Sequence, residues 1–292
     1  MRRIIAAIVL LICCACAIAD RFPVTVTDAR GKTVHIASRP ERIISLAPSN
    51  TEILFALGVG DSVVGVTKRC DYPPAARKIA PVGDVLISTE RVVSLRPDLI
   101  VAHTTMNPSV IAVMERRGIP VVVVNPESFA DLKRDITTIG RAVGASQAAV
   151  RMVRHIDDSL ADVRAAAKRL GHHPKTLVVI QEWPVWVAGS HTFVNEMIAI
   201  AGGENAAADI GWFGQMSMES MVMRSPEVII VVTGGRADFL HRAATRVTPA
   251  VRNGHCISLD PNLFVRPGPR LVDGLRGISR IYQDLDHGEH RR

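Results

Sequence analysis

The residue types that support catalysis and metal binding are present, but their spacing follows no catalytic or metal-binding pattern. Ten histidines occur in 292 residues, yet they do not form a spaced set; His172 and His173 follow a long predicted helix, and His287 lies in the polar tail. Zinc sites need several His, Cys or carboxylate ligands that converge. A zinc or manganese site is therefore only a distant alternative.

Enzymatic signatures are absent in the same way. The sequence has no glycine-rich dinucleotide loop, Walker A loop, nucleophile elbow or H-E-x-x-H motif. Asp71 and Asp84 would act as an acid–base pair only if folding brought them together by coincidence. We therefore expect a binding protein and no enzymatic activity.

The aromatic residues are few, and the tryptophans lie close to predicted loops. They make up only 4% of the chain, with three tryptophans and two tyrosines. Trp183, Trp186 and Trp212 all lie in or beside predicted loops. Ligand sites are often lined by aromatic side chains together with a few polar groups, so these loops are candidates for the wall of a binding site. The alternative is that each tryptophan packs on its own part of the fold.

One motif occurs twice. The segment "STERVVSLRPDLIVA" begins at Ser88, and "SMESMVMRSPEVIIVV" begins 129 positions later at Ser217. Ser, Glu, Val, Pro and Ile recur in register, so Glu90 corresponds to Glu219. A second pair, "TEILFALG" and "NEMIAIAG", is offset by 144 positions. The second half of the chain thus repeats part of the first.

The elements around these motifs alternate between strand and helix. Short strands are predicted at 43–46 and 99–102 and, within 121–124, by a run of valines, with helices between them. The segment 128–170 instead shows only helical periodicity, and about 24 residues of it form one rod of roughly 36 Å at 1.5 Å per residue. The strand–helix pattern then restarts near residue 175.

The predicted fold is α/β, with two similar Rossmann-like lobes joined by one long rigid helix and a ligand cleft between the lobes. Interdomain clefts are favoured ligand sites. The expected divisions are a signal peptide at 1–19, an N-terminal lobe at 20–145, a linking helix at 146–171 and a C-terminal lobe with a polar tail at 172–292.

Five segments in order carry a family resemblance. They are "RIISLAPSNTEILFALG", "CDYPPAA", "LRPDLIVA", "GGEN" and "RPGPRLVDGL". Together they resemble the helical-backbone (class III) substrate-binding proteins of ABC importers, and most of all the periplasmic cobalamin-binding proteins. The resemblance covers about residues 38–285. It implies capture of cobalamin or a related corrinoid and delivery to a permease dimer with its ATPase, with haem or a ferric siderophore as the alternative. No cofactor is implied, and we expect a monomer.

The resemblance also implies site residues. The cleft positions are Pro48, Tyr72, Asp84, His103, Trp186, Trp212, Phe213, Asn262, Phe264 and Arg266. Asp84 and His103 stand where cobalamin-binding members carry tryptophans, which weakens the stacking surface of the first lobe. His103 could instead meet a metal centre, and Tyr72 could ligate haem iron.

The repeated glutamates gain a role from the same resemblance. In cobalamin-binding members a surface glutamate on each lobe docks into arginines of the permease, and Glu90 and Glu219 match those positions. The alternative is that both are ordinary glutamates of a first helical turn, following the capping residues Ser88 and Ser217.

The N-terminus predicts export. Two arginines precede an apolar run from Ile4 to Ala19 that ends in Ala-Ile-Ala, which is typical of a secretory signal peptide. We expect a periplasmic or cell-envelope protein, with lipidation near Cys16 as a variant. The net charge of +7 is spread along the chain, which disfavours nucleic-acid binding. Cys70 and Cys256 remain in the mature chain, and the sequence leaves open whether they form a disulfide.

Overall fold

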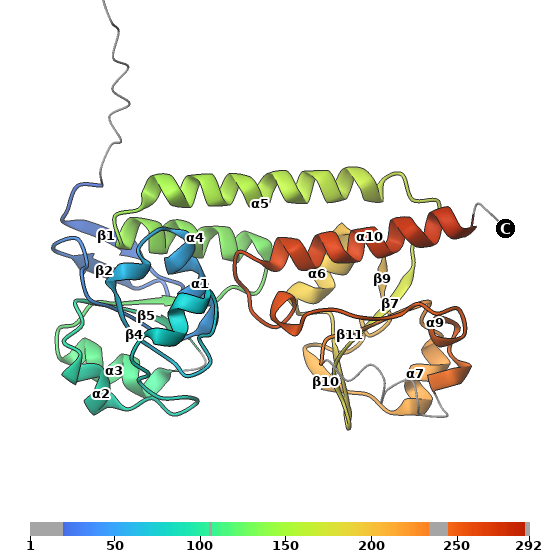
Figure 1. Cartoon of the computed structure of the whole chain (residues 1–292), viewed down its shortest axis with the longest axis horizontal. Helices are drawn as coiled ribbons and strands as arrows, with labels where there is room; N and C mark the ends of the chain where they lie inside the picture. The colour runs from blue at the N-terminus through green and yellow to red at the C-terminus, as the bar shows by residue number, and fades with distance from the viewer. Residues whose placement is uncertain (1–19, 105–106, 234–244, 290–292) are drawn as a thin grey trace, which may run out of the picture.

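The protein folds into two α/β lobes that lie side by side and share one long helix (Figure 1). The computed structural model describes residues 20–104, 107–233 and 245–289. The predicted signal peptide and Cys16 lie outside the described residues. Within the described part, no helix is long and apolar enough to cross a membrane.

The N-terminal lobe is built on a four-stranded parallel sheet with the strand order β4-β3-β5-β6. An antiparallel hairpin precedes it, with Gly31 in the turn. Strand β6 and the first four residues of β5 are apolar and buried, as expected for parallel strands covered on both faces, and β5 ends in the half-buried His103. The elements of this lobe are β1 (Val24–Thr27), β2 (Thr33–Ile36), β3 (Ile43–Ser45), α1 (Pro48–Ala56), β4 (Val63–Val66), α2 (Thr89–Ser94), β5 (Leu99–His103), α3 (Pro108–Arg116), β6 (Val121–Val124) and α4 (Phe129–Ala142).

The C-terminal lobe contains a mixed sheet with the order β10-β8-β7-β11-β12, and β9 pairs with β7. Strands β7, β11 and β12 are parallel, whereas β8 and β10 form an antiparallel extension. The elements are β7 (Lys175–Glu182), β8 (Val185–Ala188), α6 (Phe193–Ile200), β9 (Glu204–Asn205), β10 (Phe213–Gln215), α7 (Met218–Arg224), β11 (Val228–Val231), α9 (Pro249–Arg252), β12 (Cys256–Ser258) and α10 (Leu271–Glu289).

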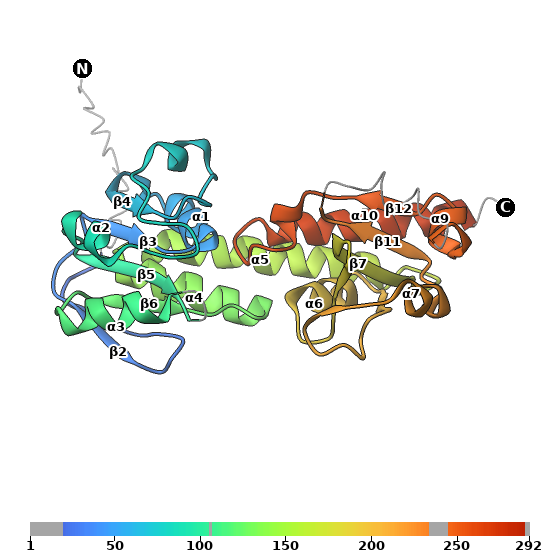
Figure 2. The same ribbon diagram turned by 90° about the horizontal axis from the view of Figure 1, so that it is seen from below.

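Helix α5 (Ser146–Ala167) runs along both lobes on one side of the molecule, about 33 Å long at 1.5 Å per residue (Figures 1 and 2). It packs on α4 of the first lobe and on α6 and α10 of the second. Its apolar face, which includes Ile156, Leu160 and Val163, is part of one continuous core that contains side chains of both lobes. The carboxylate of Asp20, the first described residue, accepts a hydrogen bond from the Ser146 N–H at 2.8 Å and so serves the N-terminus of this helix.

The repeated motif folds the same way in both lobes. Ser88 and Ser217 cap α2 and α7. Each serine side chain accepts a hydrogen bond from the backbone N–H three residues further along the chain. Each helix is followed within two residues by one in the left-handed region, Arg96 with φ 46° and Ser225 with φ 47°, and a proline comes next. The 129-residue offset is therefore a structural repeat, and most of the repeated residues have a role in the fold.

The acidic residue after each proline anchors the neighbouring strand. The Asp98 carboxylate accepts the Arg42 N–H at 3.0 Å, directly before β3. The Glu227 carboxylate accepts the Lys175 N–H at 2.7 Å, at the first residue of β7. The other two glutamates of the motif, Glu90 and Glu219, are exposed.

Candidate binding site

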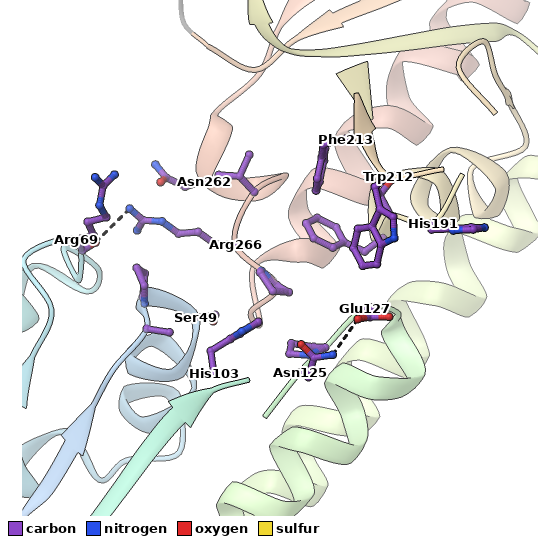
Figure 3. Close-up of a pocket in the computed structure, with 17 residues that line it drawn as sticks. Ser49, Arg69, His103, Asn125, Glu127, His191, Trp212, Phe213, Asn262 and Arg266 are labelled. Carbon is purple, nitrogen blue, oxygen red and sulfur yellow. Dashed lines mark hydrogen bonds between the residues drawn. The ribbon is translucent and has the colours of Figure 1, made fainter. Parts of the chain in front are cut away.

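A pocket of about 420 Å³ lies between the lobes. Its N-terminal wall is formed where parallel strands end, which is the usual position of ligand sites in α/β sheets. Pro48 and Ser49 follow β3, His103 ends β5, and Asn125 and Glu127 follow β6. This wall is mainly polar (Figure 3).

The C-terminal wall is aromatic. Phe193, Trp212 and Phe213 line it, and Trp212 and Phe213 face the polar wall across the pocket (Figure 3). The Trp212 loop is held in place because the backbone N–H of Gly189 donates to the Trp212 carbonyl at 2.8 Å, and the His191 N–H donates to Gly211 at 2.7 Å. The loop therefore presents a fixed aromatic surface on this side of the pocket.

The loop before α10 closes the third side of the pocket. It contributes Asn262, Val265, Arg266 and Pro267. The Arg266 side chain reaches to the first lobe, where its Nη1 lies 2.5 Å from Asp71 and its Nη2 donates to the Arg69 carbonyl at 3.3 Å (Figure 3). Arg69, also on the wall, has its Nε 2.6 Å from Asp84.

The polar wall is ordered by hydrogen bonds. The Asn125 side chain donates to Glu127 at 2.9 Å and accepts from the Thr104 hydroxyl at 2.5 Å. Burial lowers the pKa of His103, and the nearby Glu127 charge only partly offsets this effect. The His103 imidazole is therefore mainly neutral at pH 7.

Six predicted cleft residues lie on the pocket wall. They are Pro48, His103, Trp212, Phe213, Asn262 and Arg266. The structure shows where these side chains lie and leaves their contacts with a ligand as a prediction.

Four predicted cleft residues do not line the pocket. Phe264 is fully buried in the core, because the short turn at 261–263 directs it inward. Trp186 lies on the opposite face of β8 from the buried Val185 and Val187, where it is paired with Gln181 and Gln215. Tyr72 packs under the Arg270 guanidinium, 3.8 Å from the ring centre.

Asp84 is the fourth predicted residue that does not line the pocket. It forms an ion pair with Arg69, which does line it. Asp71 is ion-paired with Arg266 in the same way. The two carboxylates considered as an acid–base pair are thus each bound to an arginine of the wall. Trp183, the remaining loop tryptophan, is 67% exposed on the turn after β7 and does not line the pocket.

Sequence reasoning missed several wall residues. They are Ala47, Ser49, Arg69, Asn125, Pro126, Glu127, His191, Thr192, Phe193, Val265 and Pro267. The rule that ligands bind at the carboxyl ends of parallel strands would have found Asn125 and Glu127, because they directly follow the predicted strand at 121–124. The position of Arg69 carried no such signal, because it lies in an irregular loop.

Two open questions concern metals and cysteines. Across the described ranges, no group of three or more His, Cys, Asp or Glu side chains is placed to hold a metal ion, so the structure does not support the zinc or manganese alternative. Cys70 and Cys256 are both buried and form no disulfide; Cys70 packs in the core shared by the two lobes, and Cys256 packs in a different hydrophobic cluster of the C-terminal lobe.

Comparison with known proteins agrees with this architecture. A family profile described as periplasmic binding protein matches residues 43–263. The chain belongs to the periplasmic binding protein family. It is 38% identical, over 90% of its length and 87% of the relative, to an uncharacterized ABC transporter substrate-binding lipoprotein of Bacillus subtilis. It is 31% identical to a cobalamin-binding protein of Halobacterium salinarum, covering 91% of this chain and 76% of that protein.

A solved structure shows the same fold. The periplasmic heme-binding protein of Roseiflexus sp. RS-1 in apo form superimposes with a TM-score of 0.76 and 32% identity, over 84% of this chain and 98% of that one. These comparisons confirm the predicted fold class and the family resemblance. The chain is a substrate-binding protein of the ABC transporter class, located in the periplasm or cell envelope, and its relatives are transport proteins and not enzymes.

Proposed function

We propose that this protein captures cobalamin or a related corrinoid in the interlobe pocket. The observation that carries the proposal is the asymmetry of the pocket, an aromatic wall opposite a wall of amide, hydroxyl and imidazole groups. A corrin is a flat macrocycle rimmed by amides. Its face can stack on Trp212 and Phe213, while Asn125 and Ser49 can exchange hydrogen bonds with rim amides. The cobalamin-binding relative supports the same ligand class.

A titration tests this proposal. Residues 20–292 are titrated with cyanocobalamin while absorption and tryptophan emission are recorded. We expect saturable binding with quenched emission, and Trp212→Phe should remove most of the quenching. Trp183→Phe is the matched control, because Trp183 is not on the wall. Absence of saturable corrinoid binding would refute the proposal.

Haem is the second candidate. Two histidines favour it, because His103 and His191 line the pocket from different lobes and imidazole is a common iron ligand. The Roseiflexus relative binds heme. If haem is the ligand, a hemin Soret shift should be lost in His103→Ala or His191→Ala. The earlier candidate, Tyr72, should have little effect because its ring packs under Arg270.

Delivery requires little movement between the lobes. The Glu196 carboxylate on α6 accepts the Phe129 N–H at the start of α4 at 2.8 Å, and α5 is packed on both lobes. We expect the radius of gyration, measured by X-ray scattering, to change by less than about 1 Å on ligand binding, in contrast to hinge-closing proteins. A change of several ångströms would contradict this part of the mechanism.

We propose further that Glu90 and Glu219 dock on the permease. Both are exposed, and neither takes part in an ion pair within the described part of the chain. The helices that bear them, α2 and α7, lie on the side of the molecule away from α5 (Figure 1). The pKa of each carboxyl is lowered, first by its own backbone N–H and then by the capping serine, so both are negatively charged at neutral pH.

The docking proposal predicts that ligand binding and permease binding depend on different residues. A double variant, Glu90→Ala with Glu219→Ala, should keep its ligand affinity and lose at least about tenfold in permease affinity, because rim charges mainly steer and orient association. Asp158→Ala with Asp162→Ala removes the same charge from α5 and is the control. Equal losses in both double variants would contradict the assignment.

A further inference from the structure

Charged residues of both lobes meet beside the pocket. We call Glu52, Asp71, Arg266 and Arg270 the interlobe charge cluster. Arg270 binds the Glu52 carboxylate through two hydrogen bonds of 2.6 and 2.8 Å. Arg266 lies 2.5 Å from Asp71 and 3.7 Å from Glu52. Both carboxylates come from the first lobe and both arginines from the loop before α10.

The cluster neutralises a cation of the pocket wall. Arg266 lines the pocket, but its charge is balanced by Asp71 and Glu52 behind it. The Glu52 side chain is only 3% exposed, so solvent does little to screen it. The Arg266 hydrogen bond lowers the pKa of Asp71, which keeps that carboxyl ionised near neutral pH.

The other charged residues of the wall also add no excess positive charge. Arg69 is paired with Asp84, although this pair is exposed and therefore weaker. Glu127 adds a carboxylate to the wall itself. Counting these residues with the interlobe charge cluster, four carboxylates face three guanidinium groups. Among the described residues, the site holds arginine donors, yet these side chains carry no surplus of positive charge.

Resting on the proposed macrocycle site, we propose that the interlobe charge cluster makes this pocket select ligands with neutral, amide-bearing rims over ligands with carboxylate rims. A rim amide can accept a hydrogen bond from Arg266 without disturbing its ion pairs. A rim carboxylate must either compete with Asp71 or face Asp71, Glu52 and Glu127 as a like charge. Like charges placed together at an interface are disfavoured.

Two pairs of ligands with nearly the same shape test the inference. The first is cyanocobalamin and its monocarboxylate derivatives, in which one rim amide has been hydrolysed to the acid. The second is hemin and its dimethyl ester, which lacks the two free carboxylates. At pH 7.5 we expect the neutral member of the pair that binds to have at least about tenfold higher affinity, equivalent to about 1.4 kcal/mol.

A variant tests the cause. Asp71→Asn removes one of the two negative charges next to Arg266. The preference for the neutral ligand should therefore shrink to about twofold or reverse. Asp209→Asn is the matched control, because Asp209 also pairs with an arginine at 2.5 Å, Arg224, outside the pocket. High salt should also narrow the preference in the wild-type protein.

The outcomes separate this inference from the proposed function. If cyanocobalamin fails to bind but the hemin ester binds better than hemin, the corrinoid proposal is wrong and the charge inference holds. If the acid binds as well as the amide, or hemin binds better than its ester, the charge inference is overturned. An unchanged preference in Asp71→Asn would likewise overturn the role of the interlobe charge cluster.

Discussion

Asp135 should make the stability of the protein depend on pH in an unusual direction. It lies on α4, its side chain is 2% exposed, and its carboxylate accepts the Asn125 N–H at 3.1 Å behind the polar wall. Burial raises its pKa from 3.8 to about 6, although the Asn125 hydrogen bond and the Arg134 charge oppose the shift. The charges of Asp131 and Asp28 act in the same direction as burial.

The sign follows from linkage. The folded protein binds the Asp135 proton more tightly than the unfolded chain does, so protonation favours the folded state. Between pH 7 and pH 5 the folded state takes up this proton while the unfolded chain remains ionised. With a folded pKa of about 6 and an unfolded pKa near 3.8, this carboxyl adds about 1.4 kcal/mol to the free energy of unfolding at pH 5 relative to pH 7. The gain levels off below about pH 4.

The measurement is urea unfolding of the wild type and Asp135→Asn at pH 7 and pH 5. The asparagine keeps an acceptor for the Asn125 N–H and cannot titrate. The difference in the free energy of unfolding between the two proteins should shift by about 1.4 kcal/mol in favour of the wild type at pH 5. A difference that stays constant across this range would refute the reasoning.

Asp131→Asn is the control for the same experiment. Burial raises the pKa of Asp131, but the Ser128 hydrogen bond and the Arg134 charge outweigh it, so the net shift is downward. A lowered pKa stabilises the folded state above the ordinary value and loses this effect as the pH falls. Because both states keep Asp131 ionised between pH 7 and pH 5, the difference between the wild type and Asp131→Asn should stay almost constant over this range, and the stabilising effect of Asp131 should be lost only below about pH 4.

Three further predictions concern stability. Glu52→Ala should lower the free energy of unfolding by about 3 kcal/mol in urea, because the partly buried Arg270 guanidinium loses its carboxylate partner; a loss under 1 kcal/mol would contradict this role. Gly189→Ala should cost about 1–3 kcal/mol and weaken cyanocobalamin binding, because a Cβ would lie 2.0 Å from a backbone carbonyl of the Trp212 loop. Gly31→Ala is the control, because its φ of 76° makes alanine costly for stability there, yet the site is away from the pocket and binding should be unchanged. Ser88→Ala and Ser217→Ala should each cost about 1 kcal/mol, and unequal losses would show that the two caps are not equivalent.

The sequence by itself determined the local elements and their repetition. Helices and strands follow hydrophobic periodicity, which depends on neighbours within a few positions. The repeated motif showed that Ser88 corresponds to Ser217 and so predicted two similar helix starts. The left-handed residues at Arg96 and Ser225 were not predicted, although the proline after each one indicated that the helix had ended.

The pocket was predictable only where it follows from those elements. His103 could be placed at the end of its strand, because parallel strands present their carboxyl ends at one edge of a sheet. Loop side chains were harder. Phe264 and Arg266 are two positions apart, yet the first is in the core and the second is on the wall, because irregular backbone has no fixed period from which side-chain direction can be read.

Only the tertiary structure decided the electrostatics of the site. Asp71 and Arg266 are 195 residues apart and meet at 2.5 Å, and Glu52 and Arg270 are 218 residues apart and meet at 2.6 Å. Sequence shows which residues carry charge, but Coulomb energy depends on separation and burial. Both quantities are set when α5 and the core around it hold the two lobes together.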